Sequence, residues 1–421
     1  MEFLTRERMD WNVYRILKGS GRYLTGSVVS TAATFLISLF VSRYLGPEGI
    51  GVFSLCFATV LIGVLLSDLG INSLIMREFA DHGRPSLVSL RFILFLRSAS
   101  AFIVSGCVFL LGIYSFPHMR LLCGAIALLI ISRSVGGTLE NFLKARLYDT
   151  TCLILTMASS FIQVVTVFAF LHLGFGIGEV FLALLIVDCT KILLLLSLAR
   201  NGLAARTTSL LSLSERVKPI LAQSLPFAVI GLFSMVGERG DLFLLAAFCG
   251  TGEAGFYSAA DRFLRIGTLV DSSLLSSLLP ILSSVASRSQ LDRITKQTLT
   301  VLLSVSIVGA LALYLAAPIL MGLTFRFSES TPLLRILSLS LPAIITHSIL
   351  RTSLFSLHQE RAVAIVFGVA CVLNILLNIA FIPQFGAMGA AVISTFTEYS
   401  IVGMYGVLYF KKVVIRAAAM E

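Results

Sequence analysis

Charged residues are scarce in this sequence. Only 13% of its 421 residues are charged, whereas 57% are apolar, and the mean hydropathy is +0.96. A soluble domain carries about 25% charged residues, so the composition excludes a water-soluble globular enzyme and a disordered chain. The seven cysteines stand singly, without a C-x-x-C pair, so the sequence predicts neither a zinc site nor a disulfide framework.

Several catalytic motifs are also missing. The sequence has no G-x-x-x-x-G-K-[ST] segment to cradle the phosphates of ATP and no H-E-x-x-H segment to bind a catalytic zinc ion. It also lacks the D-x-D pair of a metal-dependent glycosyltransferase. We therefore expect a protein that is not an enzyme and that uses no cofactor or metal.

Long apolar segments dominate instead. A helix needs about 20 apolar residues to cross about 30 Å of hydrocarbon. Short segments rich in Gly and Pro, such as 46–49 and 383–386, are typical of turns between such helices. The sequence therefore predicts an all-α integral membrane protein with about twelve transmembrane helices. These are residues 24–43, 50–68, 90–115, 119–139, 151–172, 178–199, 222–247, 255–280, 297–317, 332–356, 362–382 and 387–410.

The distribution of Lys and Arg predicts the orientation. If the N-terminus is cytoplasmic, 21 of the 32 basic residues lie in cytoplasmic segments, 3 lie outside and 8 lie within spans. Cytoplasmic loops are enriched in Lys and Arg, so we expect both termini in the cytoplasm and the protein in the inner (plasma) membrane. Residues 1–23 combine basic residues with Trp11 and Tyr14, which is typical of an amphipathic helix at the cytoplasmic interface.

A repeat relates the two halves of the chain. Gly46, Gly51, Phe53 and Ser54 match Gly250, Gly255, Tyr257 and Ser258 at a constant offset of 204 residues. Both copies enter the second span of a six-span half, so the halves have the same topology, which is a recurrent transporter design. We expect pseudo-symmetric six-helix bundles over 24–200 and 219–421, joined by a cytoplasmic linker over 201–218.

Basic and acidic residues inside the spans are the candidate functional residues, because each is costly in hydrocarbon and should face protein or water. Arg239 lies eight residues before the outer end of the seventh span, and Arg262 seven after the outer start of the eighth. At 1.5 Å per residue both lie roughly 10–12 Å below the outer surface. They can share a layer with Asp241, Asp261 and Arg265.

Within this layer, the spacing of three residues places Arg262 and Arg265 on one helix face, while Asp261 is expected to point to a neighbouring helix. The cations predicted to line the lumen and bind substrate are Arg262, Arg265, Arg239, Arg97, Arg133 and Lys191. The acids that are candidates for ion coupling are Asp188, Glu398 and Asp68.

Several segments resemble one transporter family. They are residues 42–53 (SRYLGPEGIGVF), 68–70 (DLG), 224–227 (SLPF), 255–262 (GFYSAADR) and 383–391 (PQFGAMGAA). The chain resembles, over nearly its whole length, the Wzx-type flippases for lipid-linked oligosaccharides. The resemblance implies the multidrug/oligosaccharidyl-lipid/polysaccharide fold, in which two six-helix bundles surround a central cavity and work by alternating access.

The family's substrates are undecaprenyl-pyrophosphate-linked sugar repeat units, moved to the outer leaflet for O-antigen, capsule or exopolysaccharide assembly. The resemblance also places Arg262 where related lipid II flippases carry an arginine, although twelve spans rather than fourteen argue against a peptidoglycan role. The implied partners are the lipid-linked oligosaccharide and membrane lipids, with a polysaccharide polymerase and export machinery as further candidates. No nucleic-acid partner is expected.

Charge supports this interpretation, since arginines offer paired hydrogen bonds to phosphate.

Two other functions remain open. A drug or cation antiporter of the same superfamily would need an anionic lumen, whereas the first span, 24–43, carries no acidic residue. A membrane-embedded polymerase or ligase would be an enzyme, and such enzymes usually have a large external loop. Without an ATP site, energy must come from an ion gradient, the membrane potential or removal of product.

Overall fold

The computed structural model describes residues 2–68, 71–72, 90–115, 117–146, 148–200, 231–233, 235–283, 288–357 and 359–414. Within these ranges the chain forms helices and short connections, and no strand. The N-terminal helices are α1 (Glu2–Asp68), α3 (Leu90–Ser115), η1 (Pro117–Met119), α4 (Arg120–Ala145), α5 (Asp149–His172) and α6 (Ile177–Leu198). The C-terminal helices are α9 (Thr251–Ser283), α10 (Arg288–Leu323), α11 (Ser330–Ser338), α12 (Leu341–Ser356), α13 (Glu360–Tyr409) and η2 (Phe410–Val414).

Two of the long helices are each interrupted at one glycine. Gly46 has φ 69° and ψ −166° within α1, and Gly386 has φ 55° and ψ −140° within α13. This left-handed region favours glycine because other residues pay a steric cost there. The turns predicted over 46–49 and 383–386 are therefore too long: in each case the backbone leaves the helix at a single glycine.

The helices agree with the predicted spans. Among the described residues, eight helical stretches are long and apolar enough to cross a membrane. The kinks divide two of these, in α1 and α13, into two spans each. Helix α9 covers the predicted span 255–280, and helical residues 235–249 cover the C-terminal part of 222–247. The prediction of an all-α membrane protein with about twelve transmembrane helices is confirmed.

Three predicted boundaries differ from the structure. The span predicted as 332–356 is broken between α11 and α12, and the span predicted to end at 139 continues as α4 to Ala145. Helix α1 runs without a break from Glu2 to Gly46, so no backbone break separates 1–23 from the first span. The predicted linker, 201–218, lies outside the described residues. The orientation of the termini stays a prediction.

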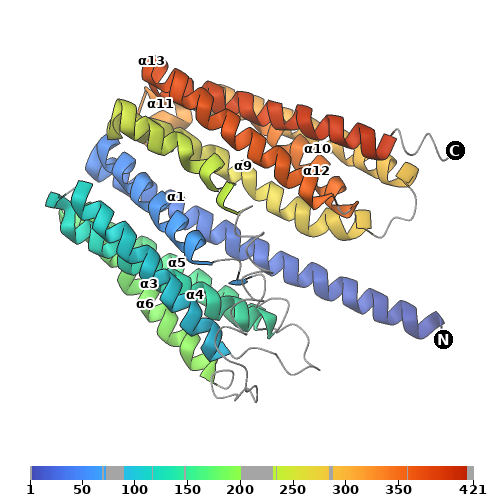
Figure 1. The fold of residues 1–421 in the computed structure, drawn as a ribbon, viewed down its shortest axis with the longest axis horizontal. Coiled ribbons are helices and arrows are strands. Elements are labelled where there is room, and N and C mark those ends of the chain that lie inside the picture. Colours follow the sequence, from blue (N-terminus) through green and yellow to red (C-terminus); the bar gives the residue numbers. More distant parts are fainter. Residues whose placement is uncertain are drawn as a thin grey trace. The chain divides into compact units, whose positions relative to one another are not determined.

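The chain contains two compact units. The C-terminal unit comprises Met1–Thr31, Gly46–Gly51 and Val236–Glu421, and the N-terminal unit comprises Ala32–Leu45 and Val52–Met235. In the N-terminal unit, α4 packs against α3 and α6, and α5 packs against α6 (Figure 1). Its core at one end of these helices includes Ile93, Leu139, Phe142 and Leu195, each at most 3% exposed.

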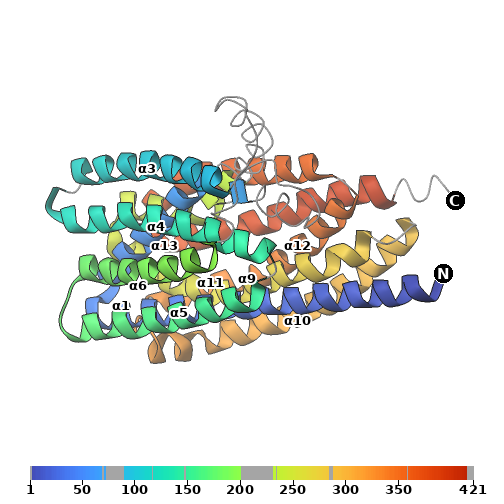
Figure 2. The ribbon, with the colours of Figure 1, turned by 90° about the horizontal axis from the view of Figure 1, so that it is seen from below.

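In the C-terminal unit, α12 packs against α9, α10 and α13, and both views show these long helices side by side (Figures 1 and 2). A core that includes Leu282, Ile349, Leu354 and Tyr405 joins them. The outward faces of α10 and α13 carry exposed Val, Leu, Ile and Phe side chains. Such apolar exposure suits contact with lipid rather than water.

The repeat has the same backbone geometry in both copies. Gly46 and its equivalent Gly250 both have positive φ angles, 69° and 90°. Within the C-terminal unit, a Cβ atom on Gly51 would lie 1.9 Å from the carbonyl oxygen of Thr251, and one on Gly255 would lie 1.9 Å from that of Pro47. Exchanging the two copies leaves this contact unchanged, as at a two-fold axis.

Candidate functional site

A group of charged side chains in the C-terminal unit lies on α9 and on helical residues 235–249. On α9, Arg265 Nε is 2.6 Å from Asp261 Oδ2, and Arg265 Nη1 is 3.9 Å from Glu238 Oε2. Residues four apart are neighbours on a helix surface. The Asp261 carboxylate therefore pairs with the arginine one turn further along its own helix, and it also interacts electrostatically with Arg239 on the neighbouring helical residues 235–249.

Two more arginines belong to this group, which we call the arginine cluster (Arg239, Arg262 and Arg265). Arg262 is 7% exposed and interacts electrostatically with Arg239, Arg265 and Asp261. The Nε atom of Arg239 is buried and has no hydrogen-bond partner in the described part of the chain. The structure thus brings together the residues that depth arithmetic placed in one layer.

Asp241 is held at the edge of this cluster by hydroxyl groups. Tyr257 donates a hydrogen bond to Asp241 Oδ2, and Ser394 Oγ on α13 donates to the same oxygen at 3.2 Å. The Leu242 backbone N–H donates to Oδ1 at 2.8 Å. Sequence reasoning missed Tyr257 and Ser394 as site residues, although Tyr257 belongs to the repeat.

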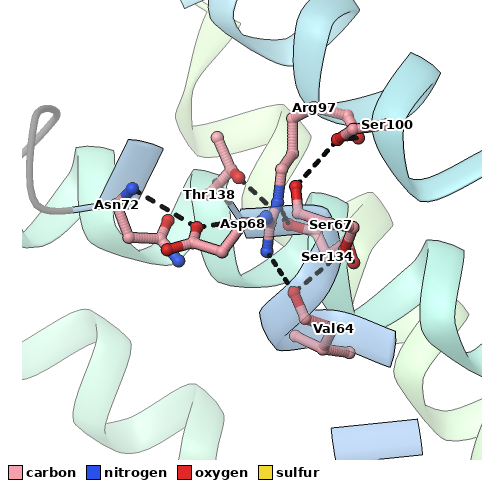
Figure 3. Close-up of polar contacts among 8 residues, drawn as sticks. All are labelled: Val64, Ser67, Asp68, Asn72, Arg97, Ser100, Ser134 and Thr138. Carbon is pink, nitrogen blue, oxygen red and sulfur yellow. Dashed lines mark hydrogen bonds and ion pairs between the residues drawn. The ribbon is translucent and has the colours of Figure 1, made fainter. Parts of the chain in front are cut away.

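The predicted cation Arg97 and the predicted acid Asp68 form an ion pair in the N-terminal unit. Arg97 Nη1 is 3.1 Å from Asp68 Oδ1, and Nη2 donates to the Val64 carbonyl at 3.2 Å. Figure 3 shows the Arg97 side chain reaching from α3 to the end of α1. The Arg97 side chain is fully buried, so its charge is neutralised inside the unit.

Hydroxyl groups complete this network. Ser100 Oγ donates to the Ser67 carbonyl at 2.7 Å, and the hydroxyls of Ser67 and Ser134 are 2.8 Å apart (Figure 3). The Asn72 backbone N–H donates to Asp68 Oδ1 at 3.3 Å. Helices α1, α3 and α4 are thus joined by polar contacts, as expected where a charge is buried.

The other two predicted N-terminal cations also have acidic partners. Arg133 Nε is 2.9 Å from Asp188 Oδ2, and the Arg133 guanidinium lies over the Phe57 ring, 5.0 Å from its centroid. Gln163 donates to the second oxygen of Asp188 at 2.9 Å. These contacts place Arg133 and Asp188, predicted separately as a substrate ligand and an ion-coupling group, in one network.

Lys191 pairs with an acid that the sequence analysis did not select. Its Nζ is 2.9 Å from Glu140 Oε2, and Lys144 Nζ is 2.7 Å from Oε1 of the same carboxylate. Glu140 was missed because the predicted span ended at 139. The remaining acid, Glu398, lies 2.8 Å from His347, a residue that sequence spacing did not connect to it.

Comparison with known proteins identifies the family. Residues 16–286 match the family described as polysaccharide biosynthesis protein. The chain belongs to this family. It is 24% identical over 390 residues to a protein of Haloferax volcanii named as a low-salt glycan biosynthesis flippase, covering 90% of this chain and 80% of the relative. It is 23% identical over 400 residues to a protein of Shigella flexneri named as an O-antigen transporter, covering 90% and 93%.

Solved structures of membrane transporters share the fold of this family member. The lipid II flippase MurJ in an inward closed conformation superposes with a TM-score of 0.69 at 13% identity, covering 94% of this chain and 90% of that one. An inward-facing multidrug transporter of the MATE family gives 0.72 at 15% identity, covering 94% and 98%. The fold is that of the multidrug/oligosaccharidyl-lipid/polysaccharide superfamily, and the chain is a multi-pass membrane protein.

Proposed function

We propose that this protein is a flippase that moves undecaprenyl-pyrophosphate-linked oligosaccharide repeat units across the inner membrane by alternating access. The product would serve assembly of O-antigen, capsule or exopolysaccharide. Membership of the polysaccharide biosynthesis protein family supports this function, as do the names of the Shigella and Haloferax relatives. We further propose that the protein acts as a transporter without catalysis, beside a polymerase and export machinery.

The arginine cluster is the observation that carries the proposal for the binding site. A pyrophosphate offers several anionic oxygens, and a guanidinium group binds two of them with parallel hydrogen bonds. Arg239 has a buried Nε without a hydrogen-bond partner in the described part of the chain. Arg262 and Arg265 lie within electrostatic range of it. We therefore assign head-group binding to these three arginines.

The other three predicted cations receive a different role. Arg97, Arg133 and Lys191 each lie within 3.1 Å of a carboxylate of the same unit. Arg265 also has such a partner, Asp261 at 2.6 Å, but two further arginines lie within electrostatic range of it. We propose that these three pairs mainly hold the helices of the N-terminal unit together, and that Asp68 and Asp188 serve this purpose rather than ion coupling.

Export of polysaccharide by cells that depend on this protein tests the proposal. We expect Arg262→Ala to abolish export at normal protein level, and Arg262→Lys to retain partial export, because Lys keeps the charge but loses the planar fork. Arg351→Ala is the matched control. This arginine also lies in a span of the C-terminal unit, but over the Phe367 ring at 5.9 Å. We expect it to retain most export.

Two results would contradict the proposal. Full export by Arg262→Ala at normal protein level would remove this arginine from the binding site. Failure of the wild-type protein to support export, together with resistance to cationic drugs in a sensitive strain, would favour the antiporter alternative.

A further inference from the structure

A buried titratable pair in the C-terminal unit joins α12 to α13 and is separate from the arginine cluster. His347 Nε2 is 2.8 Å from Glu398 Oε2, and the two side chains are 6% and 31% exposed. The other ring nitrogen of His347, Nδ1, is buried and has no hydrogen-bond partner in the described part of the chain. Buried polar atoms are nearly always bonded, so such an exception points to a function.

The pair lies near the middle of a span. Glu398 comes 12 residues after the kink at Gly386 and 11 before the end of α13 at Tyr409, which is roughly 17 Å from either end. Ionisable residues at this depth are costly and are typical of ion and proton pathways. In many transporters the coupling site also lies near the midplane.

Glu398 does not share the exposed apolar face of its helix. Val392, Phe396, Tyr399 and Val407 are 48–56% exposed and recur at helical spacing. Glu398 follows Phe396 by two residues, which turns its side chain about 200° away from that stripe. The exposed part of the Glu398 side chain is therefore directed away from the apolar stripe.

The chemistry of the pair suits a proton better than a metal ion. Imidazole changes its charge between about pH 5 and 8, whereas hard cations require several oxygen ligands. The described residues contain no group of three or more His, Cys, Asp or Glu able to hold a metal. On α13 the Tyr405 ring also lies near His347, with the ring centroids 6.5 Å apart, and on α12 itself Arg351 follows His347 by one turn. Helices α9 and α10 also pack on α12, but no charged group of theirs contacts His347 in the described part.

We propose that His347 and Glu398 form a proton-binding site that couples a pH gradient to transport, a role that rests on the proposed function. One proton is shared between Nε2 and Oε2. A second proton enters through the exposed carboxylate, is held on the pair, and leaves when the site faces the other side. Ser394, one turn before Glu398 on α13, donates to Asp241, which interacts electrostatically with Asp261 and Arg265. Helix α13 thus carries both Glu398 and a serine that contacts the edge of the arginine cluster.

Reconstituted full-length protein can test the coupling. The probe is an undecaprenyl-pyrophosphate-linked disaccharide with a fluorescent group on the sugar, and dithionite quenching reports its distribution between the leaflets. Potassium and valinomycin hold the membrane potential at zero. Without a pH gradient, the wild-type protein should equilibrate the probe between leaflets. With a gradient it should shift the ratio by up to about tenfold per pH unit for one coupled proton, and the shift should reverse with the gradient.

Variants of the pair should distinguish a loss of coupling to the pH gradient from a loss of probe movement between the leaflets. We expect His347→Gln and Glu398→Gln to equilibrate the probe but to lose the response to the gradient. The exchange His347→Glu with Glu398→His should recover part of it. His118→Gln and Glu360→Gln, both at exposed positions, are the matched controls and should respond as the wild type does. Gel filtration and thermal unfolding confirm that each variant is folded.

Three other results would overturn the inference. A folded Glu398→Gln variant that still follows the gradient would remove the pair from coupling, as would a wild-type response to a sodium gradient alone. Folded variants that cannot equilibrate the probe would place the pair in the substrate path instead. If the wild-type protein itself does not equilibrate the probe, the proposed function fails and not the coupling.

Discussion

Arg97 and Arg239 are both arginines of membrane spans, but their guanidinium groups have different surroundings. Arg97 meets the Asp68 carboxylate, and two of its nitrogens donate to backbone carbonyls. Arg239 has a buried Nε without a partner in the described residues and lies near two further arginines. A buried charge that has its partners stabilises one arrangement of helices. Around Arg239 the other arginines repel one another, which favours an anionic ligand, although Asp261, Glu238 and Asp241 also lie within electrostatic range. We propose that the same residue type serves structure in one unit and binding in the other.

Removal of Arg97 should therefore reduce stability rather than only transport. Arg97→Ala removes the positive charge 3.1 Å from the Asp68 carboxylate, and breaking a buried pair typically costs about 3–5 kcal/mol. We expect a lower thermal unfolding temperature in detergent and a lower protein level in membranes. Arg91→Ala, at an exposed position six residues earlier on α3, is the matched control and should leave both unchanged.

The double variant Arg97→Met with Asp68→Asn extends this test. Because it removes both charges, it should recover much of the lost stability and also export. If Arg97→Ala were as stable as the wild type yet inactive, Arg97 would belong to the substrate path.

At the scale of elements, glycine decides where helices bend and where they touch. Gly46 and Gly386 allow backbone angles that divide α1 and α13 into spans. Gly51 and Gly255 instead lie within helices and allow close approach of the backbone to Thr251 and to Pro47. Small residues at such crossings are common where membrane helices associate.

Substitution of the crossing glycines should reverse the usual effect of alanine. In a helix, Gly→Ala normally stabilises by roughly 0.5–1 kcal/mol. At Gly51 or Gly255 the added Cβ would meet a carbonyl oxygen at 1.9 Å, so we expect Ala to lower the unfolding temperature and Val to lower it further. Gly309→Ala on α10, where no atom lies within 4 Å of the added Cβ, should be neutral or stabilising.

Thermal unfolding of the three alanine variants in detergent measures this difference. Equal unfolding temperatures for Gly51→Ala and Gly309→Ala would mean that the helices do not cross as closely as the structure has them.

The sequence was sufficient to predict the helices but not their pairing. The lengths of the apolar segments predicted about twelve spans. The offset of 204 residues between the repeat copies correctly paired Gly46 with Gly250. Helical periodicity specifies the face on which a residue lies, but not which neighbouring helix meets that face. For this reason Glu140 and His347 were not recognised as partners of Lys191 and Glu398, and the pairing of Asp261 with Arg265 on its own helix was not predicted.

At the scale of the whole molecule, the fold does not select the substrate. Both a lipid II flippase and a multidrug transporter superpose on the chain at TM-scores of 0.69 and 0.72. Function must therefore be argued from the side chains that the fold carries. Here those side chains are the arginine cluster and the His347–Glu398 pair, both in the C-terminal unit.

Orientation in the membrane decides which end of this site opens to the cytoplasm. Cytoplasmic segments should hold most of the Lys and Arg residues that lie outside spans, so reporters fused after residues 84, 206, 290 and 415 should read cytoplasmic. Reporters after 48, 118, 175, 251 and 328 should read external.

The repeat provides an internal check on this topology. Residues 48 and 251 lie in the two equivalent segments, and a half with an even number of spans brings both to the same face. A half with five or seven spans would instead bring them to opposite faces. If the reporters after 48 and 251 read external as expected but the reporter after 206 does not read cytoplasmic, the span count is wrong near the middle of the chain. Opposite readings at 48 and 251 would contradict the six-plus-six arrangement and the symmetry that the Gly51 and Gly255 contacts indicate.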